Sequence, residues 1–227
     1  MAAEKSYESD VFATLLGELK ITFLGHGSLL FSFKGLQIYV DPFSRVANYA
    51  SLPKADLILI THEHMDHLDL PAINSVRTPK TVIVLTETCA RQLSGGKVMH
   101  NGDRLVAIGV PVQAVPAYNL VNKRPDGFPF HPRGVGNGYI LTFGDQQVYV
   151  AGDTENIPEM NTLKGIDCAF LPMNLPYTMT PEMVADAARM IKPRVLYPYH
   201  FGDTPTNRIT ELLKDDTGIE VRIRALA

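Results

Sequence analysis

The stretch Leu57–His67, LILITHEHMDH, decides both the fold and the chemistry of this chain. Its first four residues form an uninterrupted apolar run, which is typical of a β-strand buried on both faces. The run leads into a polar segment that carries His62, His64, Asp66 and His67. Open α/β sheets place ligand sites at the carboxyl ends of their strands, and this segment lies at such an end. Imidazole and carboxylate groups at this spacing predict a metal site suited to zinc, iron(II) or manganese.

Two other candidate ligands follow apolar runs in the same way. Asp153 ends the stretch Val148–Asp153, and His200 follows Val195–Tyr199. Taken alone, Asp153 is equally a turn residue, since Gly-Asp pairs form turns, and His200 is equally a core histidine. Their shared position after a strand favours the interpretation that both are ligands.

Working outward, the apolar pattern predicts an α/β fold. Period-two and fully apolar runs predict strands, and capping signals and helical spacing predict helices, one of them opening at Thr180. The expected strands cover 19–24, 29–33, 36–40, 57–60, 81–85, 104–108, 112–115, 138–143, 147–151, 168–171, 195–199 and 219–224, and the other helices 70–76, 87–93 and 207–214. Two sheets covered by helices on their outer faces, a four-layer αββα sandwich, fit this order.

The first 17 residues differ from the rest of the chain in their predicted structure. Residues 1–17 are predicted to form an N-terminal extension, and the spacing of Val11, Leu15 and Leu16 predicts a short helix within it. Residues 18–227 are predicted to form a single domain, which 227 residues allow.

Composition narrows the functional classes. The net charge is -3 and basic residues form no run, which argues against a nucleic-acid-binding face. Cys89 and Cys168 stand far apart in apolar contexts, as reduced buried thiols do. We find no signal-peptide pattern and no apolar run of about 18 residues, so we expect a cytoplasmic protein without a membrane span.

The histidine-rich motif resembles that of the metallo-β-lactamase superfamily. The resemblance runs from about Ile21 to Arg224 and includes Gly152-Asp153-Thr154 and His200. Three further segments are similar to small metal-dependent hydrolases near the ascorbate-6-phosphate lactonase group, and these segments are Leu24–Ser28, Phe130–Gly134 and Leu171–Met179.

This resemblance implies a site for two divalent metal ions, with zinc favoured and manganese or iron as alternatives. It assigns His62 and His64 to the first ion. The ligands it assigns to the second ion are Asp66, His67 and His200, and Asp153 would bridge the two. A hydroxide held between two such ions can attack an ester, lactone or phosphodiester. Asp66 would then serve as ligand and as proton acceptor.

The chain departs from the superfamily pattern at one position. A third histidine for the first ion is expected after the strand that ends near Pro116, but Ala117-Tyr118-Asn119 stands there. Our hypothesis is that His131 supplies the missing imidazole. Asn119 as a weak oxygen ligand, or a site with a single metal ion, are the alternatives.

Two further residues are open cases. His26, between two glycines, is interpreted as a catalytic residue near the metals or the substrate, with a turn histidine bonded to the backbone as the alternative. Arg133 could hold an anionic substrate, because guanidinium matches phosphate and carboxylate geometry, or could be a solvated loop residue.

The sequence therefore predicts a metal-dependent hydrolase that acts on a small molecule, which could be anionic. Whether the protein forms a homo-oligomer is left open. Two other classes compete with it. Di-iron redox proteins of this fold resemble a pattern with glutamate at the second histidine and pair with a flavin domain, whereas His64 stands at that position here. A non-catalytic metal-binding protein is the third class, and it would be expected to have lost ligands.

Overall fold

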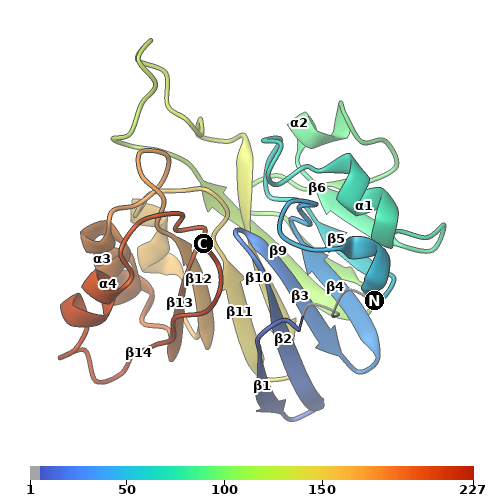
Figure 1. Cartoon of the computed structure of the whole chain (residues 1–227), viewed down its shortest axis with the longest axis horizontal. Coiled ribbons are helices and arrows are strands. Elements are labelled where there is room, and N and C mark those ends of the chain that lie inside the picture. Colours follow the sequence, from blue (N-terminus) through green and yellow to red (C-terminus); the bar gives the residue numbers. More distant parts are fainter. Residues whose placement is uncertain (1–5) are drawn as a thin grey trace.

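Two β-sheets lie face to face at the centre of the computed structural model, which describes residues 6–227 (Figure 1). Within that range each sheet has seven strands. In each, the first four strands along the chain pair antiparallel and the remaining pairs are parallel. The first sheet contains, in order, β1 (Ser9–Thr14), β2 (Gly17–Gly25), β3 (Ser28–Phe33), β4 (Leu36–Val40), β5 (Leu57–Leu59), β6 (Val82–Leu85) and β7 (Lys97–Val98). The second contains β8 (Arg104–Ala107), β9 (Val110–Ala117), β10 (Gly136–Phe143), β11 (Gln146–Val150), β12 (Cys168–Pro172), β13 (Val195–Tyr199) and β14 (Glu220–Val221).

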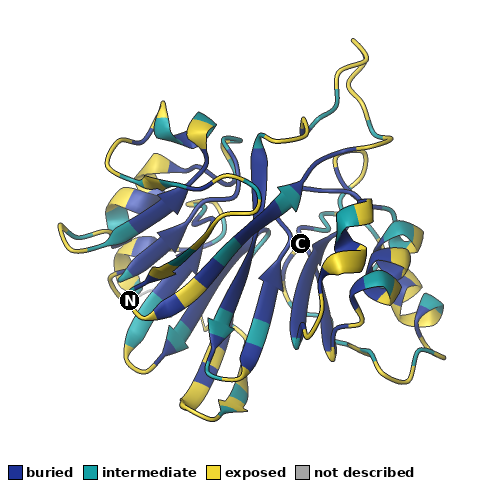
Figure 2. Ribbon diagram, turned by 180° about the vertical axis from the view of Figure 1, so that it is seen from behind, coloured by how far each residue is buried: buried dark blue, intermediate teal, exposed yellow. Residues whose placement is uncertain are grey.

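Helices cover the outer face of each sheet. On the first sheet, an apolar cluster joins the strands to α1 (Leu70–Val76) and α2 (Glu87–Ala90), with the 3-10 turn η1 (Tyr49–Ser51) beside them. On the second, another cluster joins the strands to α3 (Pro181–Ile191), α4 (Asn207–Leu212) and the 3-10 turn η2 (Pro158–Thr162). Figure 2 shows the strands mostly buried and the outward sides of the helices exposed. The predicted four-layer αββα sandwich is confirmed.

Aromatic side chains fill the space between the sheets. Phe23 of the first sheet lies 5.3 Å, between ring centroids, from Tyr197 of the second. Phe31 lies 5.6 Å from Phe143 in the same way. Tyr197 stacks at 4.8 Å on Phe170 of its own sheet. Each buried ring removes about 150–250 Å² of surface from water, so these contacts fix the two sheets against each other.

The prediction of a short helix near the N-terminus is wrong. Residues Ser9–Thr14 form strand β1, which pairs with β2 in the register Val11↔Lys20 and Phe12↔Leu19. Val11 is 55% exposed, whereas Phe12 packs against the core between the sheets. Pairing with β2 and burial of Phe12 outweigh the helical spacing of apolar residues. The first five residues of the predicted extension lie outside the described part, and the domain boundary after residue 17 stays a prediction.

Other predicted elements differ mainly at their ends. The C-terminal strand is shorter than expected, as β14 covers only Glu220–Val221, and α2 ends at Ala90. The short strand β7 was not predicted, because two residues carry no periodic signal. None of the helices described between residues 6 and 227 could cross a bilayer.

One long connection extends from the body of the molecule (Figure 1). This β9–β10 loop, residues 118–135, is exposed over most of its middle part (Figure 2). Its two stems are joined, because the Asn119 amide donates to the His131 carbonyl at 2.9 Å. The loop therefore returns to the edge of the sheets where the predicted ligands lie.

Candidate metal centre

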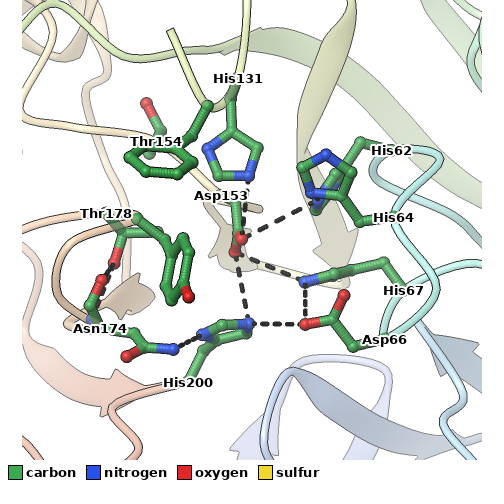
Figure 3. A network of polar contacts seen from close by, with 12 residues as sticks. His62, His64, Asp66, His67, His131, Asp153, Thr154, Asn174, Thr178 and His200 are labelled. Atoms are coloured by element: carbon green, nitrogen blue, oxygen red, sulfur yellow. Dashed lines mark hydrogen bonds and ion pairs between the residues drawn. The ribbon is translucent and has the colours of Figure 1, made fainter. Parts of the chain in front are cut away.

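Three strand ends bring most of the candidate ligands together. The segment with His62 follows β5, Asp153 lies three residues after the end of β11, and His200 follows β13 directly. After β5 the chain turns tightly, since the Leu68 amide donates to the His64 carbonyl at 2.7 Å. Figure 3 shows these side chains converging from the two sheets.

One cluster contains His62, His64, His131 and Asp153. One ligand atom of each lies within 4.8 Å of the corresponding atom of every other. His62 Nε2 is 3.1 Å from His64 Nδ1, and His131 Nε2 is 3.2 Å from Asp153 Oδ2. The loop thus delivers His131 to the place where the predicted third imidazole is needed.

A second cluster lies on the other side of Asp153. His67 Nε2 is 3.5 Å and His200 Nε2 is 3.8 Å from Asp153 Oδ1. Asp66 Oδ2 is 3.3 Å from His200 Nε2 and 3.7 Å from His67 Nε2. Asp153 therefore turns one carboxylate oxygen toward each cluster.

The distances and the unpartnered atoms test whether metal ions fit here. Zinc–nitrogen bonds of about 2.0–2.1 Å in a tetrahedron separate neighbouring ligand atoms by about 3.3 Å, close to the separations in both clusters. Three buried atoms that face these clusters have no hydrogen-bond partner among the described residues: His67 Nε2, His131 Nε2 and Asp153 Oδ1. Buried polar atoms without partners are costly, so the donor set fits a cation in each cluster.

The far nitrogens of the imidazoles are held by partners that orient the rings. Asp41, fully buried, accepts from His67 Nδ1 at 2.8 Å and from the Thr61 amide and hydroxyl at 2.8 and 2.6 Å. Thr61 Oγ1 also lies 3.0 Å from His62 Nδ1. Carboxylates behind ligand histidines fix the ring and its tautomer. Sequence reasoning missed Asp41, although it directly follows a predicted strand as His200 does.

Asn119 holds the ring of His131 in the same way that Asp41 holds the ring of His67. Its Oδ1 accepts from the His131 amide at 2.7 Å and from Nδ1 at 2.8 Å. Its Nδ2 donates to Glu155 Oε1 and to the Tyr177 carbonyl, which settles the orientation of the amide. Because Oδ1 accepts, the proton of His131 is on Nδ1 and Nε2 keeps its lone pair for the site. This geometry favours His131 over Asn119 as the third ligand.

Glu155 ties the β9–β10 loop to the same strand end. Its side chain is fully buried, and its oxygens accept from the amides of Leu120, Val121 and Asn122 at 2.6–2.7 Å. Glu155 lies only two residues after Asp153, so one segment supplies both the shared carboxylate and the anchor of the loop. No spacing pattern in the sequence indicated this contact.

Electrostatics prepares the carboxylates as ligands. Burial alone would raise the pKa of Asp153, but His200 and His67 outweigh it and hold this pKa well below its usual range. Burial also opposes the ionised form of Asp66, but hydrogen bonds from His200 and His26 lower its pKa. Burial lowers the pKa of His62 well below its usual range, so this imidazole is neutral and able to bind a cation.

His26 lies at the edge of the second cluster. Its Nε2 is 3.0 Å from Asp66 Oδ2, and its ring centroid is 3.7 Å from that of His200. Its φ of 52° lies in the left-handed region, and its amide donates to the Ala227 carbonyl. Next to it, a Cβ on Gly27 would lie 3.2 Å from the His67 ring, so any other residue would crowd this ring. His26 therefore combines a backbone-bonded turn with a side chain at the site.

A cavity of about 1170 Å³ opens over both clusters. Five of the candidate ligands and His26 reach its surface, and these ligands are His64, Asp66, His131, Asp153 and His200. Apolar side chains, among them Phe43, Met65 and Phe130, lie beside them. Arg133 is not among the lining residues, because it pairs with Glu159 at 2.7 Å. His100 also lies apart from the site, in an exposed turn beside Asp103.

The fold and this constellation agree with comparisons to known proteins. Residues 20–200 match the β-lactamase superfamily domain. A UPF0173 metal-dependent hydrolase of Pelotomaculum thermopropionicum is 31% identical over 197 residues, covering 82% of this chain and 86% of the relative. A solved structure described as a metal-dependent hydrolase from Parabacteroides distasonis is 51% identical, with a TM-score of 0.93, and covers 98% of this chain and 100% of its own. A metallo hydrolase from Ignicoccus hospitalis shares the fold at 23% identity and a TM-score of 0.73, covering 92% and 96%.

The chain therefore belongs to the β-lactamase superfamily and, within it, to the UPF0173 metal-dependent hydrolases. It is an enzyme of that class. The narrower likeness to the ascorbate-6-phosphate lactonase group stays a prediction.

Proposed function

We propose that this hydrolase binds two divalent metal ions side by side and cleaves an ester, lactone or phosphodiester of a small molecule. The observation that carries the proposal is the position of Asp153. Its two oxygens face different clusters, and each cluster supplies further imidazole or carboxylate atoms at ligand-to-ligand distances. Zinc is the favoured ion for this donor set, with manganese and iron as alternatives.

Two such ions lower the pKa of water toward about 7 and polarise a substrate oxygen. The residues divide the remaining work. The ligands proposed for the first ion are His62, His64 and His131, those for the second are Asp66, His67 and His200, and Asp153 is shared. Asp41 and Asn119 keep the rings of His67 and His131 in place, so that little reorganisation accompanies the reaction.

Proton transfer is assigned to Asp66 and His26. Asp66 Oδ2 accepts the proton that leaves the attacking water. His26 Nε2, 3.0 Å from the same oxygen and on the cavity surface, gives a proton to the leaving group. An acid and a base positioned in this way can contribute about 10²–10⁴-fold to the rate.

The two competing classes are less well supported. His64 occupies the place of the glutamate expected in a di-iron redox protein, and its Nδ1 lies 3.1 Å from His62 Nε2. A protein that binds metal without catalysis does not need His26 and Asp66 in hydrogen-bond contact beside an open cavity.

Metal analysis and a substrate panel test the proposal together. Purified protein should contain two metal ions per chain and hydrolyse at least one of a p-nitrophenyl ester, a lactone, a thioester and bis(p-nitrophenyl) phosphate. Chelation should abolish that activity, and zinc, manganese or iron should restore it. Activity that survives complete metal removal contradicts the mechanism. Fully metallated protein that cleaves no member of the panel contradicts the substrate class.

His131→Ala isolates the least expected ligand. We expect this variant to lose one metal ion or to bind it about 100-fold more weakly, as follows when a ligand is removed. His100→Ala is the matched control, because His100 is 67% exposed and lies outside the site. Unchanged metal stoichiometry and affinity in His131→Ala would show that His131 is not a ligand.

A further inference from the structure

Two arginines reach the cavity from opposite sheets. Arg45 lies in the segment after β4, and Arg124 lies in the β9–β10 loop, yet both line the cavity that opens over the two clusters. Among residues 6–227 neither one forms an ion pair with a carboxylate. The arginines that do form ion pairs are Arg133, Arg189, Arg194, Arg208, Arg222 and Arg224.

Each of the two guanidinium groups is supported by an aromatic ring of the same cavity. Arg45 lies over Phe43, with 5.9 Å between its Cζ and the ring centroid. Arg124 lies over Phe130 at 5.8 Å, and its Nη2 donates to the Phe130 carbonyl at 3.3 Å. Such stacking orders a guanidinium while leaving its other N–H groups free for a ligand.

The carboxylates of the cavity are already engaged. Asp69 accepts from the Ser44 amide and hydroxyl at 2.8 and 2.5 Å and from the Ala72 amide at 3.0 Å. Asp126 accepts from the Phe128 amide at 3.0 Å. Asp66 and Asp153 face the metal clusters. Two divalent ions balance these four carboxylates, so the charge left over in the cavity is that of the two arginines.

Much of the remaining wall is apolar and the cavity is large. Phe43, Met65, Leu68, Leu70 and Phe130 line it, and its volume of about 1170 Å³ exceeds what a small acyl ester fills. Pockets for drug-sized ligands span about 300–1000 Å³. The geometry points to a substrate whose body is apolar and which carries an anionic group away from the bond that is cleaved.

We propose that Arg45 and Arg124 form the subsite for this anionic group, a carboxylate or a phosphate, and thereby select the substrate. The proposal rests on the hydrolytic function proposed above. It replaces Arg133 as the candidate anion-binding residue, since Arg133 is held by Glu159 outside the cavity.

A matched pair of esters tests the subsite. Mono-p-nitrophenyl suberate and its methyl ester share the same scissile bond, but only the first carries a remote carboxylate. We expect wild-type enzyme to prefer the charged ester by about 10-fold in kcat/KM, as follows when a charged group gains hydrogen bonds. Arg45→Gln and Arg124→Gln should remove most of this preference through KM, and should change kcat/KM for the neutral ester much less than for the charged ester. Arg133→Gln, in the same loop as Arg124, is the matched control and should keep the preference.

Calorimetric binding of benzoate and phenyl phosphate to the metal-loaded protein provides a readout that does not depend on turnover. Both should bind about 10-fold more weakly to the two cavity-arginine variants than to Arg133→Gln. The stronger of the two ligands identifies the anion as carboxylate or phosphate. If neither ester is cleaved, ester hydrolysis is refuted while calorimetry still decides the subsite. Equal binding and an equal ester ratio in all variants would overturn the assignment of Arg45 and Arg124.

Discussion

Replacing Asn119 by alanine should weaken the binding of one metal ion and leave the binding of the other almost unchanged. The side chain is buried, and its Oδ1 accepts both the amide and the Nδ1 proton of His131. Alanine removes both acceptors, so the His131 ring is no longer held with Nε2 toward Asp153. Loss of such a supporting contact typically costs about 10–100-fold in metal affinity.

The same change also has a cost in stability. The amide and the Nδ1 proton of His131 lose their acceptor while they stay buried. Each loss lowers the free energy of unfolding by about 1–3 kcal/mol. Relaxation of the loop recovers part of this, so we expect the free energy of unfolding to fall by about 2–4 kcal/mol. The backbone amide of residue 119 still donates to the His131 carbonyl after the substitution. This hydrogen bond keeps the two stems of the β9–β10 loop together.

Zinc titration against a chromophoric chelator measures the two affinities separately, and urea unfolding of the metal-free protein measures stability. Asn122→Ala is the matched control, because Asn122 is in the same loop but donates its side-chain amide to the Thr178 carbonyl and does not contact His131. If Asn119→Ala loses stability yet binds both zinc ions as the wild type does, then Asn119 is only a structural residue. The orientation of the His131 ring would then not depend on Asn119.

Two further substitutions test other parts of the structure. Asp10→Asn should lower stability by about 1–2 kcal/mol at pH 7, because Asp10 on β1 accepts from Tyr197, Arg222 and Arg224. Burial raises the pKa of Asp10, but these contacts outweigh it and lower the pKa below its ordinary value of 3.8. The contribution is therefore complete above that value and disappears as the pH falls through the folded-state pKa, so urea unfolding should show a smaller difference between the two proteins at pH 3 than at pH 7. Gly27→Ala should weaken zinc binding by about 10-fold, since the added Cβ would lie 3.2 Å from the His67 ring; wild-type zinc affinity in the chelator titration would contradict this crowding.

The parts of the site that the sequence predicts are those that depend on local order. A buried strand that ends within three residues of a polar side chain indicates where His62, Asp153 and His200 lie. His131 was expected because the superfamily pattern leaves one ligand missing and the loop holds one histidine. Its position opposite Asp153 agrees with that hypothesis, and its role as a ligand stays a prediction.

The parts that could not be predicted depend on contacts between distant segments. Asn119 was considered only as a weak ligand, since nothing local shows that its oxygen faces the His131 ring. Arg124 was interpreted from the sequence as part of a solvated basic group with Lys123 and Arg133, and nothing local singled out Arg45. Only the folded chain brings the two arginines to one cavity. The strand β1 was mistaken for a helix for the same reason, because its stability comes from β2 and from the Asp10 contacts.

The β9–β10 loop supplies His131 to the metal cluster and Arg124 with Phe130 to the cavity wall. The two proposals above therefore predict that metal loading and substrate choice are thermodynamically linked through one segment. If His131 and Arg124 act as proposed, a ligand that orders this loop should raise the affinity for the first metal ion, and that ion should then raise the affinity for the ligand by the same factor. A change of specificity achieved by exchanging the loop would have to carry Asn119 and His131 together, whereas the strand-end ligands could remain untouched.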